Sequence, residues 1–232
     1  MKIISLNIAG CKGLNQRLAK IVDFLNQEDA DIVCLQEVIF SDGTNQAEEI
    51  NDRLDNPYQN LIVEIAEVFT PRSGAPYTEG LAILARVDEV NVEKAVLQPT
   101  DKHTRIALNV DLSDGMKISN IHLANNDESF RQLSELLEKL GDNEHFIVGD
   151  FNMRKRVLLK NSQTWNDRYR VSVDFANYIS CPDAPDDLMV LDYMLLPYNY
   201  CFTNIRTVAG LSDHNAIIFE IKKCKAPASR NQ

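Results

Sequence analysis

The sequence predicts an α/β protein in which two mixed β-sheets pack face to face and helices cover their outer faces. Short apolar runs typical of β-strands outnumber the helical patterns. Four of these runs follow one another between residues 81 and 123 with little helical pattern between them, which favours antiparallel pairing. On either side of this block, a helical pattern lies between two apolar runs. Most connections are short, so a layered sandwich is the most economical architecture.

Individual elements follow from the spacing of the apolar residues. Helices are predicted over residues 15–27, 44–54 and 130–140. Strands are predicted at residues 2–8, 31–35, 61–69, 81–85, 90–96, 106–112, 117–123, 145–148, 188–196, 200–208 and 215–221. Gly141 is placed to end the last of the helices, and Asp114-Gly115 is typical of a hairpin turn.

The composition is that of one domain, predicted over residues 1–222, with a polar tail over residues 223–232. The formal net charge of −10 repels nucleic acid and anionic membranes, so binding to either requires a local basic patch. No apolar run approaches the length of a membrane span, and the first strand is too short for a signal peptide. We therefore expect a cytoplasmic monomer without an obligate protein partner.

The cysteines carry a separate expectation about redox state. There are five, an odd number, and no two of them form a C-x-x-C pair. In a cytoplasmic protein this pattern predicts reduced thiols. Cys34 lies inside an apolar run and is expected to pack in the core.

Polar side chains recur at the ends of the predicted strands. They are Asn7, Glu37, His122, Asp150, Asn152, Asp192, Asp213 and His214. Strand ends on one edge of a sandwich converge, so these groups are expected to share one cleft. Several carboxylates in one cleft repel each other, and a divalent cation relieves that repulsion. Carboxylate and amide oxygens suit Mg²⁺ or Mn²⁺, and the histidines can stabilise charge on a phosphate ester attacked by water.

The same positions carry a resemblance to the endonuclease/exonuclease/phosphatase superfamily. The motifs are Ser5-Leu6-Asn7, Leu35-Gln36-Glu37-Val38, Ser119-Asn120-Ile121-His122-Leu123, Gly149-Asp150-Phe151-Asn152, Leu191-Asp192-Tyr193-Met194-Leu195 and Ser212-Asp213-His214. Each motif alone is weak, but six in this order are specific and cover most of the chain. The superfamily includes DNase I, exonuclease III-type abasic-site endonucleases, neutral sphingomyelinases and inositol polyphosphate 5-phosphatases. The resemblance implies a DNase I-like four-layer α/β/β/α sandwich.

The resemblance also implies a role for each residue on the metal side of the cleft. Glu37 is expected to be the principal ligand of Mg²⁺ or Mn²⁺. Asn7 is expected to orient Glu37 and to lie beside the metal and the phosphate, and Asp213 is expected beside the metal. Asp150 positions or deprotonates the attacking water, and Asn152 holds that water and a phosphate oxygen.

The histidines are assigned by the same resemblance. Asp192 lies in an otherwise apolar strand and needs a partner, so we expect a direct hydrogen bond between its carboxylate and His214. His214 then faces the phosphate, and His122 contacts a phosphate oxygen. The motifs assign the general base to either Asp150 or His214. Arg105, at a strand edge, is expected to be solvated.

A basic cluster follows directly after Asn152, within an irregular segment over residues 153–187. Residues 153–172 contain six basic side chains and one acidic one. One interpretation is a solvated helix face. The other is an anion-binding patch in which Arg154 and Arg156 contact the substrate and Trp165 and Tyr169 stack on a base or head group.

Together these observations predict a metal-dependent phosphoesterase. A nuclease-like phosphodiesterase is the first hypothesis. The alternative is a phosphatase or phosphodiesterase for a small molecule or a lipid head group, which the acidic charge favours. Ala9 also favours it, because abasic-site endonucleases usually carry an Asp at this position. A non-catalytic binding module on the same scaffold is a distant third, because it could lose the polar set without harm.

Overall fold

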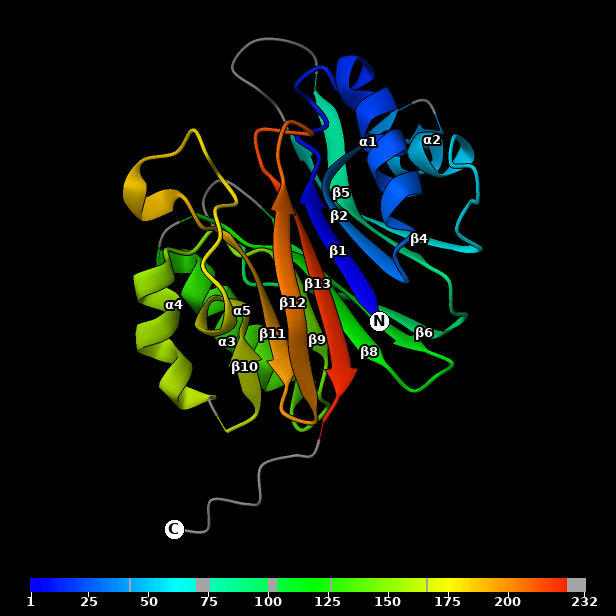
Figure 1. Cartoon of the computed structure of the whole chain (residues 1–232). Coiled ribbons are helices and arrows are strands. Elements are labelled where there is room, and N and C mark those ends of the chain that lie inside the picture. Colours follow the sequence, from blue (N-terminus) through cyan, green and yellow to red (C-terminus); the bar gives the residue numbers. More distant parts are fainter. Residues whose placement is uncertain (42, 70–75, 100–103, 126, 166, 225–232) are drawn as a thin grey trace.

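A computed structural model describes residues 1–41, 43–69, 76–99, 104–125, 127–165 and 167–224. In this part of the chain two β-sheets lie face to face, with helices on the outer side of each (Figure 1). Sheet A has the strand order β12-β13-β1-β2-β5-β4, with β3 paired to β2. Sheet B has the order β10-β11-β9-β8-β7-β6.

The strands of sheet A are β1 (Lys2–Asn7), β2 (Ile32–Ser41), β3 (Thr44–Asn45), β4 (Asn60–Phe69), β5 (Tyr77–Ala85), β12 (Tyr200–Val208) and β13 (Ala216–Lys223). Those of sheet B are β6 (Glu89–Val96), β7 (Ile106–Leu112), β8 (Lys117–His122), β9 (Phe146–Asp150), β10 (Tyr169–Val171) and β11 (Asp192–Pro197). The helices are α1 (Leu14–Glu28), α2 (Gln46–Asp52), α3 (Asp127–Leu140), α4 (Lys155–Asn161) and α5 (Ser172–Phe175), with 3-10 turns η1 (Ser162–Thr164) and η2 (Asp186–Leu188). None of the described helices is long and apolar enough to cross a membrane.

Each sheet is built around one parallel strand pair connected through a helix. In sheet A the pair is β1 and β2, joined through α1, and in sheet B it is β8 and β9, joined through α3. The other strand pairs are antiparallel. Parallel strands need such a crossover. Four of the polar residues predicted at strand ends, Asn7, Glu37, His122 and Asp150, lie on these four strands.

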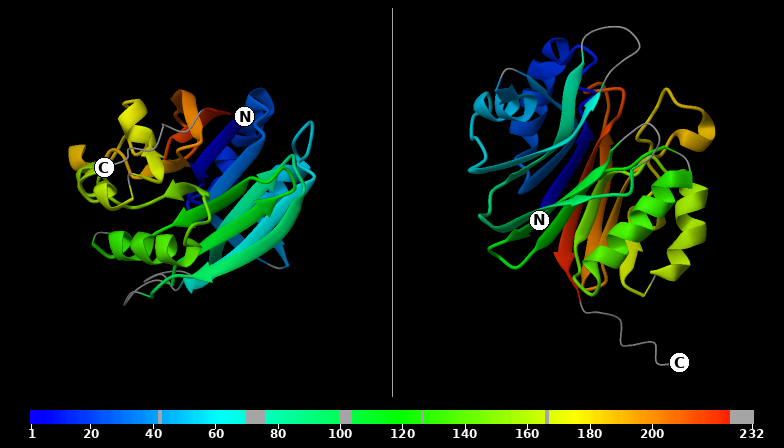
Figure 2. Two further views of the ribbon diagram at one scale, coloured as in Figure 1. Left: turned by 90° about the horizontal axis from the view of Figure 1, so that it is seen from below. Right: turned by 180° about the vertical axis from the view of Figure 1, so that it is seen from behind.

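Three hydrophobic clusters fill the spaces between four layers. One lies between α1, α2 and the outer face of sheet A, and another between the two sheets. The third packs α3, α4 and the loops near them against the outer face of sheet B (Figure 2). The predicted α/β/β/α sandwich is therefore confirmed.

Most predicted elements are confirmed, with some boundaries shifted. The strand predicted over residues 31–35 runs on to Ser41 through an irregular pairing with β5. The strand predicted over residues 188–196 begins only at Asp192, because η2 and a turn precede it. The irregular segment 153–187 contains the short elements α4, η1, β10 and α5.

The expectation that all thiols are reduced is wrong for two cysteines. Cys201, in β12, and Cys224, just after β13, form a disulfide with their Cα atoms 5.8 Å apart. Because β12 and β13 are antiparallel neighbours, residues far apart in sequence meet at their ends. Lys223 and Cys224 are thus part of the fold, and the rest of the predicted tail lies outside the described residues.

A buried amide fixes sheet B against sheet A beside the irregularity in β2. The register between β2 and β5 shifts between Leu35 and Val38. Asn120, on β8 and fully buried, donates from Nδ2 to the carbonyl oxygens of Leu35 and Ala82, both at 2.9 Å. Its Oδ1 accepts a hydrogen bond from Gln36 Nε2 at 2.7 Å. One side chain of sheet B therefore supports the backbone that leads into Glu37.

Replacing this amide should destabilise the fold. Asn120→Leu removes three buried hydrogen bonds and should lower the free energy of unfolding by about 2–4 kcal/mol, because buried polar groups left unpaired are costly. Urea unfolding followed by circular dichroism measures the loss. Asn204→Leu is the control, because that exposed amide bonds only the Glu220 side chain. Equal small losses in both variants would contradict the role of Asn120.

Candidate functional site

The candidate site lies where the carboxyl ends of both parallel strand pairs meet. Asn7 is the last residue of β1, His122 the last of β8 and Asp150 the last of β9. Ligands of α/β sheets commonly bind beyond the carboxyl ends of parallel strands. The structure therefore brings together residues that the sequence placed only at separate strand ends.

Register places three side chains of sheet B in one row. Asp150 pairs with His122 on the parallel strand β8 and with Asp192 on the antiparallel strand β11. Neighbours in register project from the same face of a sheet. All three are buried, with 6%, 1% and 2% of their surface exposed for His122, Asp150 and Asp192.

Asn7 connects this row to sheet A. Its Nδ2 donates to Asp150 Oδ2 at 3.1 Å and to Glu37 Oε1 at 3.0 Å. Its Oδ1 accepts the backbone N–H of Ala9 at 3.0 Å, which fixes the orientation of the amide. The amide nitrogen, and not the oxygen, thus faces both carboxylates. This geometry suits the expected orienting role of Asn7, whereas direct metal ligation through Oδ1 would compete with the Ala9 contact.

Three residues at the site adopt the left-handed backbone conformation. The φ angles of Ala9, Glu37 and Asn152 are 44°, 54° and 47°, and among the described non-glycine residues only Asp29 shares this property. Each left-handed residue with a side chain costs roughly 1–2 kcal/mol. At Glu37 the conformation coincides with the register shift in β2 and turns the partly buried carboxylate toward Asn7.

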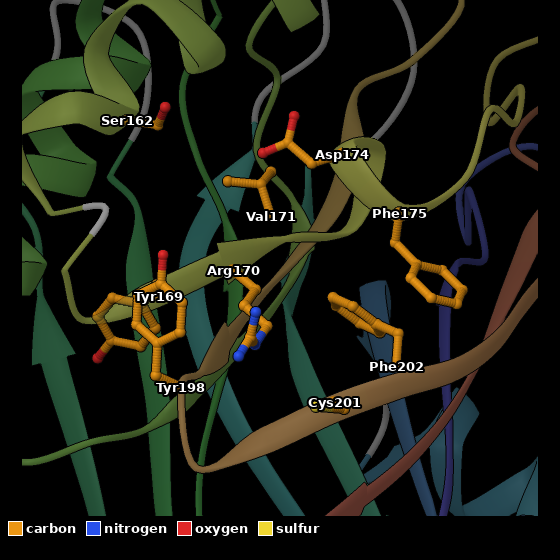
Figure 3. A pocket seen from close by; sticks show the side chains of 9 residues that line it. All are labelled: Ser162, Tyr169, Arg170, Val171, Asp174, Phe175, Tyr198, Cys201 and Phe202. Atoms are coloured by element: carbon orange, nitrogen blue, oxygen red, sulfur yellow. The ribbon is translucent and has the colours of Figure 1, made fainter. Parts of the chain in front are cut away.

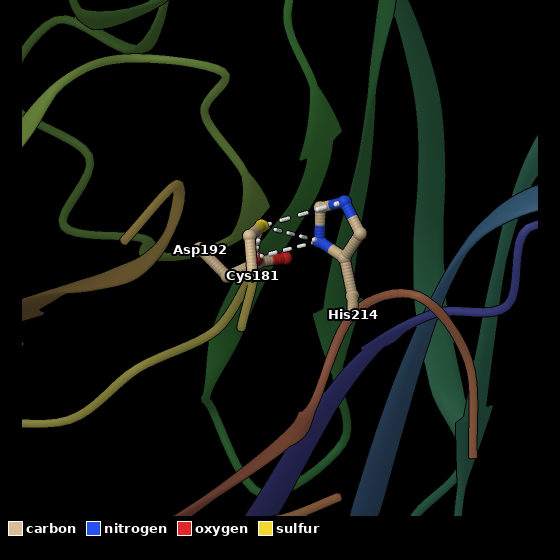
Figure 4. A group of neighbouring side chains, drawn as sticks. All are labelled: Cys181, Asp192 and His214. Carbon is tan, nitrogen blue, oxygen red and sulfur yellow. Dashed lines mark hydrogen bonds and ion pairs between the residues drawn. The ribbon is translucent and has the colours of Figure 1, made fainter. Parts of the chain in front are cut away.

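The predicted hydrogen bond between Asp192 and His214 is confirmed. His214 Nδ1 lies 2.8 Å from Asp192 Oδ2 (Figure 4). The other ring nitrogen, Nε2, lies 3.9 Å from Asp150 Oδ2. Burial disfavours the charged imidazole, but the adjacent Asp192 carboxylate outweighs it and raises the pKa of His214 well above its ordinary value. The ring is thus held as an imidazolium that points its free N–H at Asp150.

Asp150 is the acceptor at the centre of the site. Its Oδ1 accepts the backbone N–H of Asn152 at 2.8 Å, and its Oδ2 faces Asn7 and both site histidines. Burial and the charge of nearby Asp192 raise the pKa of Asp150, while His214 and the two hydrogen-bond donors oppose that shift. A carboxylate with a raised pKa is a better proton acceptor than an ordinary aspartate.

The structure adds a buried ionic network that the sequence interpretation missed. Arg105 Nη1 lies 3.2 Å from Glu79 Oε1 and 3.3 Å from His122 Nδ1. His122 Nε2 then lies 3.7 Å from Asp150 Oδ2. Burial and the charge of Glu37 raise the pKa of Glu79 to about 7. No strand-end motif marks Glu79, and only the alternation along β5 could have pointed it inward.

The expectation that Arg105 is solvated is wrong. Only 7% of the residue is exposed, and it lies between Glu79 and Glu67, whose Oε1 is 3.8 Å from Nη1. A buried guanidinium is tolerated when carboxylates pair with it. Arg105 donates toward His122 Nδ1, which leaves the Nε2 proton of that histidine pointing at Asp150.

Two further predicted residues lie at the rim. Asp213 is exposed, and its Oδ2 pairs with Lys12 Nζ at 2.6 Å while Ser212 Oγ bonds its Oδ1. Burial alone would raise the pKa of Asp213, but the hydrogen bond and charge of Lys12 outweigh it and lower that pKa, so the carboxylate is ionised. Asn152 donates from Nδ2 to the carbonyl oxygen of Leu123 at 3.0 Å, which orients its amide at the end of β9.

The donor set around Glu37 fits a hard divalent cation. Glu37 and Glu79 are close enough for one to raise the pKa of the other, and Asn7 bonds both Glu37 and Asp150. Carboxylate oxygens suit Mg²⁺ or Mn²⁺. Among the described residues, Glu37 belongs to no cluster of three His, Cys, Asp or Glu ligand atoms within 4.8 Å of one another. Such a cation would therefore take most of its ligands from water and substrate.

The basic cluster divides into two parts. Arg154 occupies the N-cap position of α4 without a side-chain capping bond, and Lys155, Arg156 and Lys160 lie on that helix, which begins three residues after Asn152. Arg168 and Arg170 lie at β10 instead. Arg170 stacks over the Tyr198 ring with its guanidinium carbon 4.5 Å from the ring centroid, and Arg168 bonds the carbonyl oxygen of Gly141.

The expected stacking of Trp165 and Tyr169 on a substrate is contradicted by their burial. Only 5% of Trp165 and 1% of Tyr169 is exposed, and both pack in the cluster beneath α3 and α4. Apolar ring surface gains most by leaving water, and these rings have done so inside the protein. Neither offers a free ring face beside Asp150.

A cavity of about 420 Å³ lies elsewhere, between β10 and α5 on one side and the start of β12 on the other. Figure 3 shows Arg170, Tyr198, Phe175 and Phe202 around it. Tyr169, which also lines it, pairs with Pro197 at the end of β11 opposite to Asp192. The cavity is therefore separate from the cluster of strand-end residues.

Solved structures share this architecture. An endonuclease/exonuclease/phosphatase from Beutenbergia cavernae DSM 12333 superimposes with a TM-score of 0.83 at 18% identity, covering 99% of this chain and 73% of that one. The mannosyl-6-phosphatase Bt3783 of Bacteroides thetaiotaomicron VPI-5482 gives 0.65 at 14% identity, covering 96% and 99%. The human Nocturnin catalytic domain gives 0.69 at 15% identity, covering 97% and 93%. At these identities the likeness shows a shared fold.

The sequence itself is assigned by a family profile. No curated protein sequence matches the chain. The profile described as Endonuclease/Exonuclease/phosphatase family matches residues 4–214, which include the strand-end residues from Asn7 to His214. The chain therefore belongs to the endonuclease/exonuclease/phosphatase family, a family of hydrolytic phosphoesterases.

Proposed function

We propose that this protein is a divalent-metal-dependent phosphoesterase that hydrolyses a phosphate ester by in-line attack of water, as a nuclease-like phosphodiesterase. The observation that carries the proposal is the arrangement around Asp150. Its Oδ2 faces Asn7 Nδ2 at 3.1 Å and the Nε2 atoms of His122 and His214 at 3.7 and 3.9 Å. A carboxylate bordered by N–H donors can accept a proton from a water while the neighbouring donors bind a phosphate beside it.

The pKa values of Asp150 and His214 are both raised, and this suggests opposite roles for the two residues in proton transfer. Asp150, as the carboxylate, accepts the proton of the attacking water. His214, held charged by Asp192, donates toward a phosphate oxygen or the leaving oxygen. His122 donates from Nε2 to another phosphate oxygen, and Asn152 holds the water or that oxygen.

Glu37 would hold the cation, Asn7 would keep the Glu37 carboxylate oriented, and Asp213 would lie beside it. When bound, Mg²⁺ or Mn²⁺ would neutralise the negative charge of the phosphate. The protein itself orients the substrate through the amides and imidazoles that come from both sheets.

The nuclease-like hypothesis draws on the basic side chains that follow Asn152. Arg154, Lys155 and Arg156 begin α4 directly after the Asp150-Phe151-Asn152 turn, so they can reach the phosphates of an extended substrate. A phosphatase for a small phosphoester is the second candidate. The formal net charge of −10 favours it, and one protein with the same fold is a mannosyl-6-phosphatase.

A substrate panel tests the proposal as a whole. Purified protein is incubated with abasic DNA, plasmid DNA, single-stranded DNA, inositol phosphates, sugar phosphates and sphingomyelin, each with Mg²⁺, Mn²⁺ or EDTA. We expect hydrolysis of at least one phosphoester that EDTA abolishes. Failure on every substrate class with both metals would favour a non-catalytic binding module.

The Asp192–His214 pair should behave as one unit. His214→Ala should lower kcat by about 10²–10⁴-fold, the usual range for a positioned acid or base. Asp192→Asn should cost nearly as much, because the pair is only 2.8 Å apart and orients one ring. The double variant should lose little more than either single variant. Losses that multiply would show that the two residues act independently.

The metal assignment predicts unequal effects of two carboxylates. Glu37→Gln should abolish activity at saturating Mg²⁺ and weaken Mn²⁺ binding in calorimetry while the fold is retained. Asp213→Asn should have a smaller effect, because Lys12 already neutralises Asp213. Tight Mn²⁺ binding by Glu37→Gln would overturn the assignment.

The start of α4 can be tested by charge reversal. Changing Arg154, Lys155 and Arg156 together to Glu should raise KM strongly on a polyanionic substrate and flatten its dependence on salt. The matched control reverses Lys20, Lys222 and Lys223, which are exposed and change the net charge equally. If both triple variants behave alike, the α4 side chains form a solvated surface only.

A further inference from the structure

The thiol of Cys181 lies against the Asp192–His214 pair, although the proposed reaction does not use it. Cys181 Sγ is 3.5 Å from His214 Nδ1, 3.6 Å from Nε2 and 4.0 Å from Asp192 Oδ2. Figure 4 shows the three side chains converging from separate segments of the chain. Among the described residues they form the one group of three His, Cys, Asp or Glu ligand atoms within 4.8 Å of one another.

The segment that carries this thiol is held in place on both sides. Ser180 Oγ accepts the backbone N–H of Asp192 at 3.2 Å, and the Ser180 carbonyl oxygen accepts the N–H of Asn215 at 2.7 Å. Cys181 N–H donates to the carbonyl oxygen of Met189 at 3.0 Å. Ser180, the residue before Cys181, is thus bonded to the backbone of Asp192 and to that of Asn215, which follows His214. These bonds hold the Cys181 segment beside Asp192 and His214 in the absence of a ligand.

The separations are close to those of a tetrahedral zinc site. With Zn–S, Zn–N and Zn–O bonds of about 2.0–2.3 Å, tetrahedral ligand atoms stand about 3.3–3.6 Å apart. The sulfur is 3.5 Å from Nδ1 and 4.0 Å from the carboxylate oxygen. The sulfur and the carboxylate oxygen would have to approach by a few tenths of an ångström, and Nδ1 and Oδ2, at 2.8 Å, would have to separate as the proton between them leaves. The side chain of His214 is 14% exposed, which leaves an approach from solvent.

We propose that Cys181, Asp192 and His214 form an inhibitory site for a thiophilic divalent cation such as Zn²⁺. Thiolate and imidazole ligands favour Zn²⁺ over Mg²⁺, whereas the side chains around Glu37 offer oxygen. Binding at Cys181 Sγ, Asp192 Oδ2 and a ring nitrogen of His214 releases the thiol proton and a ring proton to solvent. The zinc-bound imidazole keeps one N–H but is neutral, so it has lost the positive charge and the acidic proton of the imidazolium, and the cation inhibits without displacing Mg²⁺ from Glu37.

This inference rests on the proposed function only for its inhibitory consequence, so binding is measured separately. Co²⁺, a spectroscopic substitute for Zn²⁺, is titrated into the full chain with Cys181 reduced. We expect a sulfur-to-cobalt charge-transfer band that Zn²⁺ removes and excess Mg²⁺ does not. Cys181→Ser should abolish the band. Cys11→Ser, which removes an exposed free thiol, should keep it.

Inhibition provides the second arm, on whichever substrate the panel identifies. Cys181→Ser should keep its Mg²⁺-dependent activity within a few-fold. The Zn²⁺ concentration for half-inhibition should rise at least about 100-fold, because losing a residue that merely hydrogen-bonds a metal ligand already lowers metal affinity about 10–100-fold, and Cys181 is a ligand itself. Cys11→Ser should be inhibited like the unmodified protein, and raising Mg²⁺ should not relieve the inhibition.

The two arms separate the possible failures. A cobalt band without phosphoesterase activity would retain the metal site and reject the proposed function. Activity with no sulfur-to-cobalt band, or with equal Zn²⁺ inhibition of Cys181→Ser and the unmodified protein, would overturn the site and leave the proposed function standing.

Discussion

The packing of two sheets with their carboxyl-end edges together is the constraint on which the site depends. Apolar side chains between the sheets supply most of the driving force, but they are not directional. Buried hydrogen bonds across the interface add direction. Asn120 bonds Gln36 at 2.7 Å and the carbonyl oxygens of Leu35 and Ala82 at 2.9 Å, and Asn7 bonds Asp150 at 3.1 Å. A sliding sheet would leave these amides and the Asp150 carboxylate unpaired away from water, at high cost. The same bonds that fix the interface therefore align the strand-end residues of both sheets.

Strained backbone conformations occur beside the residues that this alignment brings together. Ala9 and Asn152 hold left-handed backbone conformations just after β1 and β9, and Glu37 holds one within β2, at its register shift against β5. These conformations redirect the chain, and Asn7 Oδ1 and Asp150 Oδ1 accept hydrogen bonds from the backbone N–H groups of Ala9 and Asn152. Rigid strands on one side and side-chain hydrogen bonds on the other maintain a geometry that the backbone alone would avoid.

Charge is distributed so that each carboxylate at the site has a different environment. The Asp192 carboxylate is hydrogen-bonded to His214, and the Asp213 carboxylate forms an ion pair with Lys12. Glu79 is shared with Arg105, and burial beside Glu37 still raises its pKa to about 7. Such neighbours give similar groups different proton affinities, and acid–base chemistry requires that difference. Cys181 adds a soft ligand next to this otherwise oxygen- and nitrogen-rich set.

The sequence by itself determined the elements with strong periodicity, the order of the strand-end residues and the bond between Asp192 and His214. These follow from apolar spacing and from the need of a buried carboxylate for a partner. Only the tertiary structure decided that Trp165 and Tyr169 are core residues, that Arg105 is buried between carboxylates and that Cys201 and Cys224 meet. Burial and pairing of such residues depend on which distant segment packs over them. That choice is made by the stacking of the two sheets, and it leaves no local pattern in the chain.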